Sequence, residues 1–175
     1  MTTFPSKALR DELLRGELWH CTKPELLKSI WKDQSLRPRC APTSRTYSAS
    51  HYLNGISLFD WSRAGDDEQF AGAKSKQFFD FGIAIGLEPS KLPGRLVYYP
   101  ETRDSTSEEA TGKRIQGPIP DVEVIHIGPI PYAAATRILV FHLRSSSNFS
   151  VIPAHDNQRL LQAIEASARN SRPQP

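Results

Sequence analysis

The chain has 175 residues, of which 38% are hydrophobic and 23% charged, and it contains three Trp, five Tyr and eight Phe. This composition excludes a disordered chain, and the length is too short for two comfortable domains, so we expect one globular domain. The net charge of +3 is not concentrated in any basic run of five residues. It permits an acidic partner such as nucleic acid or a nucleotide phosphate but does not demand one.

The sequence shows no secretory signal and no apolar run near 18 residues, and its two cysteines are Cys21 and Cys40. We therefore expect a cytoplasmic protein with reduced thiols and no membrane contact, with delivery as an effector left open. The spacing of Cys and His lacks a four-ligand pattern, so we expect no structural metal. Fourteen Pro and ten Gly favour a strand-rich or mixed fold over a helical bundle.

The first part of the chain predicts a helix, a strand and a second helix. Residues 6–15 carry leucines at helical spacing and are followed by Gly16, which ends the helix. A strand follows at residues 18–21. The next helix begins at Thr22 or Lys23, and its predicted apolar face consists of Leu26, Leu27, Ile30 and Trp31. The composition of residues 37–54 then predicts a surface loop with at most a short turn of helix.

The rest of the chain predicts further strands and a C-terminal helix. Residues 55–61 predict a strand, the polar stretch 62–77 could form a helix, and residues 81–87 alternate as a strand buried on at least one face. The polar residues 101–116 predict an exposed loop. The remaining expected elements are a turn at 88–91, strands at 95–99, 122–127 and 137–143, a helical turn at 132–136 and a helix at 156–169.

These elements suggest a simple domain organisation. We expect an N-terminal helix in residues 1–16 and a main domain in residues 17–145. A C-terminal helix within residues 146–170 packs on that domain, and residues 171–175 form a disordered tail.

The most informative motif is His20-Cys21-Thr22 at the end of the first strand. Strand alternation places the side chains of His20 and Thr22 on one face and that of Cys21 on the other. Two hydrogen-bonding side chains therefore converge on one small ligand. A single His in such a setting is more often a packed residue with internal partners, so the functional interpretation depends on the features downstream.

Those features form an ordered set of motifs. Trp19-His20-Cys21-Thr22 is followed by a helix, by Ser35-Leu36-Arg37-Pro38, by Gly55-Ile56-Ser57-Leu58-Phe59-Asp60 with Ser62, and by Glu123-Val124-Ile125-His126. The set resembles the ADP-ribosyltransferase superfamily, in its branch with a His, Tyr, Glu signature that includes the poly(ADP-ribose) polymerases and toxin-like bacterial members. Over residues 17–143 the resemblance implies an α+β fold. Two small, strongly bent antiparallel sheets with peripheral helices would hold NAD in the cleft between them.

The resemblance implies roles for the residues of the first and last motifs. His20 would bond the 2′-hydroxyl of the adenosine ribose, Thr22 would reach the nicotinamide carboxamide, and the backbone of Cys21 would supply further carboxamide contacts. Glu123 would orient the 2′-hydroxyl of the nicotinamide ribose and stabilise the positive charge that develops when the glycosidic bond breaks. Without the other motifs, Glu123 would be a surface carboxylate at the start of a strand.

Within the second motif the resemblance is incomplete. Ser57 stands where the family has its Tyr, and Ser62 matches the family's Ser that supports the nicotinamide pocket. No Tyr falls at the position after Ser62 that stacks on nicotinamide. Phe70 is nearest in spacing to it, with Tyr47 and Tyr52 as competitors, although each of these rings is more often plain packing.

Other residues would contact the acceptor or the phosphates. In the family the loop before the catalytic Glu meets the acceptor, and here residues 112–120, with Gln116, fill that place. Asp121 either contacts the acceptor or closes the turn before the strand, and the two interpretations are equal. Arg37 and Arg39 could steer the pyrophosphate, although loop arginines are more commonly only solvated.

The resemblance implies a mono-ADP-ribosyltransferase that uses NAD as substrate and modifies a protein or a nucleic acid. One alternative within the same fold is an NAD-dependent RNA 2′-phosphotransferase. Another is a catalytically degenerate binding module, favoured by the missing Tyr and by Cys21 in place of the family's Gly. A residue with a Cβ is acceptable at position 21 only if the backbone torsions there are accessible to it.

Overall fold

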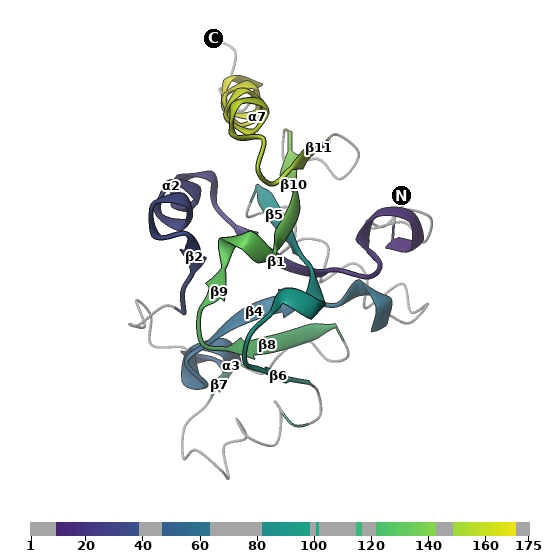
Figure 1. Cartoon of the computed structure of the whole chain (residues 1–175), viewed down its shortest axis with the longest axis vertical. Helices are drawn as coiled ribbons and strands as arrows, with labels where there is room; N and C mark the ends of the chain where they lie inside the picture. The colour runs from purple at the N-terminus through teal and green to yellow at the C-terminus, as the bar shows by residue number, and fades with distance from the viewer. Residues whose placement is uncertain are drawn as a thin grey trace.

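The computed structural model describes residues 10–38, 47–63, 82–98, 101, 115–116, 122–142 and 149–170. Its centre is an antiparallel seven-stranded sheet in the order β11-β10-β5-β1-β4-β8-β6 (Figure 1). These strands are β1 (Leu18–Thr22), β4 (Gly55–Phe59), β5 (Ile83–Leu87), β6 (Arg95–Val97), β8 (Glu123–Ile127), β10 (Ala135–Phe141) and β11 (Phe149–Pro153). The mixed α and β content agrees with the expected α+β class.

Two short ribbons flank the sheet. One is antiparallel and joins β2 (Ser35–Leu36) to β9 (Ile130–Pro131), and the other is parallel and joins β3 (Tyr47–Ser48) to β7 (Ile115–Gln116). The helices are α2 (Pro24–Asp33), α3 (Ala49–Tyr52) and α7 (Asn157–Asn170). Single turns are η1 (Arg10–Leu14), η2 (Trp61–Arg63), η3 (Pro89–Lys91) and η4 (Tyr132–Ala134).

The seven strands divide into two halves that meet at one point. Strands β1 and β5 share five register pairs, and so do β4 and β8, but β1 and β4 share the single pair Trp19 and Phe59. Because β1 and β4 run antiparallel, they separate between His20–Thr22 on one side and the first half of β4 on the other. The two sheets expected from the sequence are therefore one sheet that opens in the middle. Figure 1 shows β5, β10 and β11 above this opening, and β4, β8 and β6 below it.

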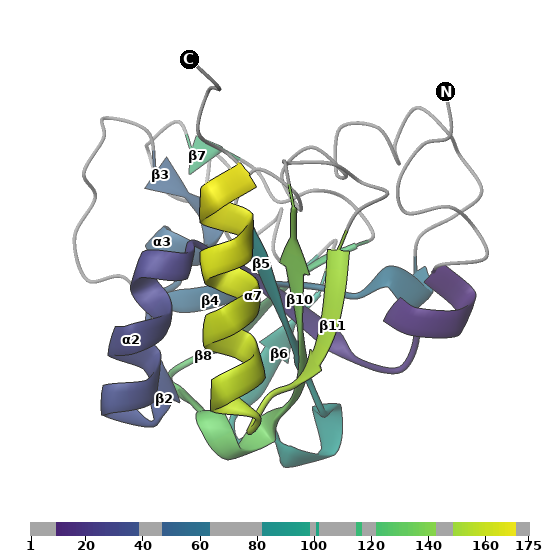
Figure 2. The same cartoon turned by 90° about the horizontal axis from the view of Figure 1, so that it is seen from above.

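Helices α2 and α7 cover the same face of the sheet (Figure 2). Pro24 occupies the first helical position of α2, where its missing N–H costs no hydrogen bond. The helix ends at Asp33 and is capped by Gln34, which has a left-handed φ of 50° and donates its N–H to the Trp31 carbonyl at 3.2 Å. Leu27 and Ile30 are buried, but Leu26 is 37% exposed, so the predicted apolar face was wrong for Leu26.

The core lies on both faces of the strands next to the opening. All five residues of β5 are buried, which extends the prediction of a strand buried on at least one face. On the face opposite α2, Trp19 is fully buried and its indole N–H donates to the Leu14 carbonyl at 3.0 Å. On the α7 side, the Ser167 hydroxyl donates to the Phe141 carbonyl at 2.9 Å, which holds the C-terminal helix to β10. The expected helix at 156–169 is confirmed.

Strand β8 begins with Glu123, and contacts near its C-terminal end hold it in place. His126 is fully buried, with its Nδ1 3.1 Å from the Gly128 carbonyl and its Nε2 against the Pro93 carbonyl. Gly55 opposes this end from β4, and a Cβ there would lie 2.5 Å from a methyl carbon of Ile125. Only glycine therefore lets β4 and β8 approach this closely.

Several boundaries differ from the sequence expectations. The strand expected at 55–61 ends at Phe59, the strand at 95–99 ends at Val97, and the strand at 137–143 starts earlier, at Ala135. Strands β2, β3, β7, β9 and β11 were not predicted, and β3 and β7 lie in segments that were expected to be loops. The helix expected at 62–77 and most of the loop at 101–116 lie outside the described residues. Within the described ranges, no helix combines the length and the apolar character needed to cross a bilayer.

Candidate functional site

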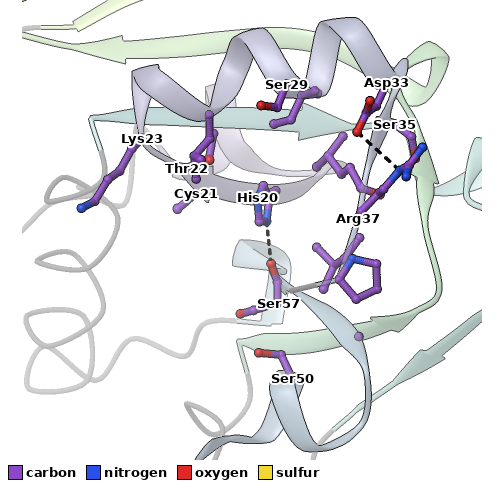
Figure 3. A pocket seen from close by; sticks show the side chains of 16 residues that line it. His20, Cys21, Thr22, Lys23, Ser29, Asp33, Ser35, Arg37, Ser50 and Ser57 are labelled. Carbon is purple, nitrogen blue, oxygen red and sulfur yellow. Dashed lines mark hydrogen bonds and ion pairs between the residues drawn. The ribbon is translucent and has the colours of Figure 1, made fainter. Parts of the chain in front are cut away.

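A cavity of about 420 Å³ lies where the sheet opens. It is lined by the end of β1, by α2, by β2 and the two residues after it, by α3 and by the first half of β4 (Figure 3). Cavities of a few hundred cubic ångströms are typical of sites for small molecules and cofactors. The opening of the sheet therefore creates a ligand-sized space beside the His20-Cys21-Thr22 motif.

His20 bridges the two halves of the sheet at the rim of this cavity. Its Nδ1 lies 3.0 Å from the carbonyl oxygen of Ser57, as the dashed line in Figure 3 shows. A carbonyl oxygen can only accept, so Nδ1 carries the proton, and Nε2 is the acceptor of the neutral ring. The bond ties β1 to β4 beyond the last register pair and fixes the orientation of the imidazole.

Thr22 and Cys21 follow the predicted alternation. His20, Cys21 and Thr22 all line the cavity, and Thr22 is 3% exposed. Cys21 also packs against the cluster around Trp19 on the other face of the sheet. Cys21 pairs with Ala84 of β5 in regular strand geometry. The non-glycine residues with positive φ in the described part of the chain are Gln34 and Asn54. Position 21 therefore accepts a side chain without backbone conflict.

The Cys21 thiol is held in its protonated form. Burial raises its pKa well above the ordinary value, and the negative charge of Glu123 raises it further. A thiol in this state is a poor nucleophile and a poor metal ligand. Cys21 therefore contributes its backbone and its bulk to the site.

Glu123 and Ser57 form the closest polar contact of the site. Glu123 opens β8 opposite Phe59 and is half-buried, and the Ser57 hydroxyl donates to its Oε1 at 2.5 Å. Hydrogen bonds with an ionised acceptor are short and strong, and this one fixes the carboxylate. Ser57 thus holds His20 through its carbonyl and Glu123 through its hydroxyl, and it brings together residues that are far apart in the sequence.

The other predicted site residues lie outside the cavity lining or outside the described residues. Ser62 is exposed in η2, where its N–H and hydroxyl both donate to Asp60 Oδ1 at 3.1 and 2.5 Å, and it does not line the cavity. Gln116 lies in β7, whose backbone pairs with β3. Phe70 and Asp121 lie outside the described residues.

One wall of the cavity was not anticipated from the sequence. Helix α2 contributes Leu26, Ser29, Ile30 and Asp33, which are spaced as one helical face. Next to it Arg37 lies with its Nε 3.5 Å from Asp33 Oδ2 (Figure 3). The spacing of these four residues was visible in the sequence, but Leu26 and Ile30 were assigned to the apolar face of the helix, and Ser29 and Asp33 were given no role.

Comparisons with protein-family models, with curated proteins and with solved structures gave no match to this chain. Among the described residues, no three side chains of His, Cys, Asp or Glu gather closely enough to hold a metal ion. The functional interpretation therefore rests on the motifs and on the geometry of this site.

Proposed function

We propose that this chain is a mono-ADP-ribosyltransferase, which cleaves the bond between nicotinamide and ribose in NAD and transfers ADP-ribose to a macromolecular acceptor. The observation that carries the proposal is the Glu123 carboxylate, held by the Ser57 hydroxyl at 2.5 Å at the same opening that His20 spans. Cleavage of this bond develops positive charge on the ribose. A fixed carboxylate beside that carbon stabilises the charge without reorganising during the reaction.

The layout of the site suits a ligand with two halves. The cavity is lined by His20, Thr22 and Ser57 but not by Glu123. A ligand that fills the cavity and reaches Glu123 must therefore extend past the bond between His20 and Ser57. NAD has this form, and we place its adenosine half in the cavity with the His20 imidazole on the ribose. In this placement Thr22, which lines the same cavity, contacts the adenosine half and not the nicotinamide carboxamide that the resemblance implied. The nicotinamide ribose then lies at Glu123.

The geometry of Cys21 removes one argument for a binding module without turnover. A left-handed backbone at this position would have excluded a side chain, but Cys21 lies in an ordinary strand. Because the raised pKa keeps the Cys21 thiol neutral, no thiolate stands beside Glu123 to repel its carboxylate charge. The acceptor is a protein or a nucleic acid.

The proposal is tested by nicotinamide release from NAD. The wild-type chain should release nicotinamide, and Glu123→Gln should lower kcat by about 100-fold or more, because the amide has the shape of the carboxylate without its charge. Glu88→Gln is the matched control, since Glu88 forms an exposed ion pair with Lys91 away from the opening. Labelled NAD with a crude lysate then reveals whether the label passes to protein or nucleic acid.

The outcomes separate the candidates. Release that Glu123→Gln abolishes and Glu88→Gln does not supports the transferase. NAD binding without release by the wild type would favour the degenerate module. No binding of NAD at all would refute both.

A further inference from the structure

The face of α2 that lines the cavity changes from apolar to acidic along its length. Leu26 and Ile30 lie on this face, and Asp33 stands at its end, in the last turn of the helix. Leu26 is a large apolar side chain that is 37% exposed, so it is accessible to a ligand in the cavity. Leu36 and Ile56 line the cavity from β2 and β4. These apolar walls suit a flat, weakly polar group such as a purine base.

Asp33 is the negatively charged member of the cavity lining. Its Oδ2 contacts Arg37 Nε at 3.5 Å, and Arg37 is its side-chain partner in the described part of the chain. Oδ1 therefore remains an acceptor for a ligand. An ionised carboxylate can accept hydrogen bonds but cannot donate one. In contrast, Ser29, one turn earlier on the same face, can both donate and accept and so favours no particular base edge.

We propose that Asp33 recognises the 6-amino group of the adenine base of NAD and discriminates against the 6-oxo base hypoxanthine. The inference rests on the proposed function, because it takes NAD as the ligand of the cavity. The amino group of adenine donates a hydrogen bond to the carboxylate. The oxygen of hypoxanthine at the same position places an acceptor against an acceptor, so this hydrogen bond is lost and the two oxygens repel each other. Asp33 is thus a specificity-determining residue of the adenine subsite.

The size of the effect follows from the exposure of Asp33. A single hydrogen bond between a side chain and a base edge discriminates less than a bidentate pair does, and the partial exposure of the Asp33 carboxylate weakens it further. We therefore expect a preference for NAD over nicotinamide hypoxanthine dinucleotide of about 10-fold in kcat/KM.

The test compares kcat/KM for these two dinucleotides in three proteins. The wild type should prefer NAD. Asp33→Asn should reduce the preference to nearly none, because the amide can rotate to present its oxygen to adenine or its NH₂ group to hypoxanthine. Arg37→Gln is the matched control, since it breaks the same ion pair but retains the carboxylate. It should keep the preference whatever its effect on the overall rate.

Calorimetric binding of both dinucleotides to the same three proteins separates this inference from the proposed function. A binding preference that Asp33→Asn removes supports the role of Asp33 even if nicotinamide release fails and refutes the transferase. If the wild type binds or uses the two dinucleotides equally, the role of Asp33 is overturned. The transferase proposal still stands in that case if the wild type releases nicotinamide from NAD. An Asp33→Asn protein that keeps the full preference also overturns the role of Asp33.

Discussion

Replacement of Ser57 by Ala removes the hydroxyl that holds Glu123 and changes little else. The bond to His20 comes from the main-chain carbonyl of Ser57, which the alanine variant retains. The side-chain bond to Glu123 Oε1, at 2.5 Å, is lost. The variant therefore separates the orientation of the carboxylate from the orientation of the imidazole, although one residue controls both.

The expected magnitude follows from the type of hydrogen bond. A bond to a charged partner contributes about 1.5–3 kcal/mol, and if this energy acts in the transition state, kcat falls about 10- to 150-fold. The loss should appear mainly in kcat, because the bond positions a group that acts on the developing charge of the ribose. Ser57→Thr, which restores a hydroxyl on the same strand, should recover part of the activity.

The assay is nicotinamide release at saturating NAD, with thermal unfolding as the measure of folding. Ser90→Ala is the control, because the Ser90 hydroxyl also donates to a glutamate, Glu88, at 2.7 Å but lies on the exposed surface. An unchanged kcat in Ser57→Ala would show that the carboxylate needs no positioning by this hydroxyl. Equal losses in Ser57→Ala and Ser90→Ala would point to a general effect on the fold.

Two further predictions concern the surroundings of the site. His126→Leu should lower the free energy of unfolding in urea by about 1–3 kcal/mol, because the carbonyl of Gly128 or Pro93 loses the buried ring N–H that donates to it, and an unchanged free energy of unfolding would contradict that structural role. In a variant that lacks the other cysteine, Cys21 should react with iodoacetamide more slowly than a free thiol at pH 8 and faster as the pH rises, because its raised pKa lowers the thiolate fraction. Glu123→Gln should speed this reaction at pH 8, because the loss of a nearby negative charge lowers the pKa of Cys21. An unchanged rate would show that the Glu123 carboxylate is too far from the Cys21 thiol to affect its pKa.

Local patterns predicted much of the fold. The strand expected at 18–21, the helix that follows it and the C-terminal helix all carry strong periodicity or end signals, and the structure has them. The strand extends to Thr22 and the helix begins at Pro24, slightly later than the expected start at Thr22 or Lys23. The alternation that separates Cys21 from its neighbours also follows from strand geometry alone. Strands such as β2 and β11 escaped prediction, because a two-residue strand or an edge strand is defined by its partner rather than by its own sequence.

The candidate site was predicted as a set of residues but not as an arrangement. Glu123 and Ser57 were both named from the motifs, but their contact depends on the register between β4 and β8, which Gly55 permits by the absence of a side chain. Asp33 was not named, because a polar residue at the end of an amphipathic helix has no distinct pattern until the helix meets a cavity.

The sequence by itself determined the strongly periodic elements, such as β1, α2 and α7, and which side chains of β1 share a face, because these properties depend on neighbours along the chain. The tertiary structure alone decided that β1 and β4 part after one pair, that His20 reaches across the opening to Ser57, and that α2 closes the cavity. These features join residues tens of positions apart. Their energy comes from pairing and packing that form only when the whole sheet is assembled, so local sequence patterns contain no signal for them.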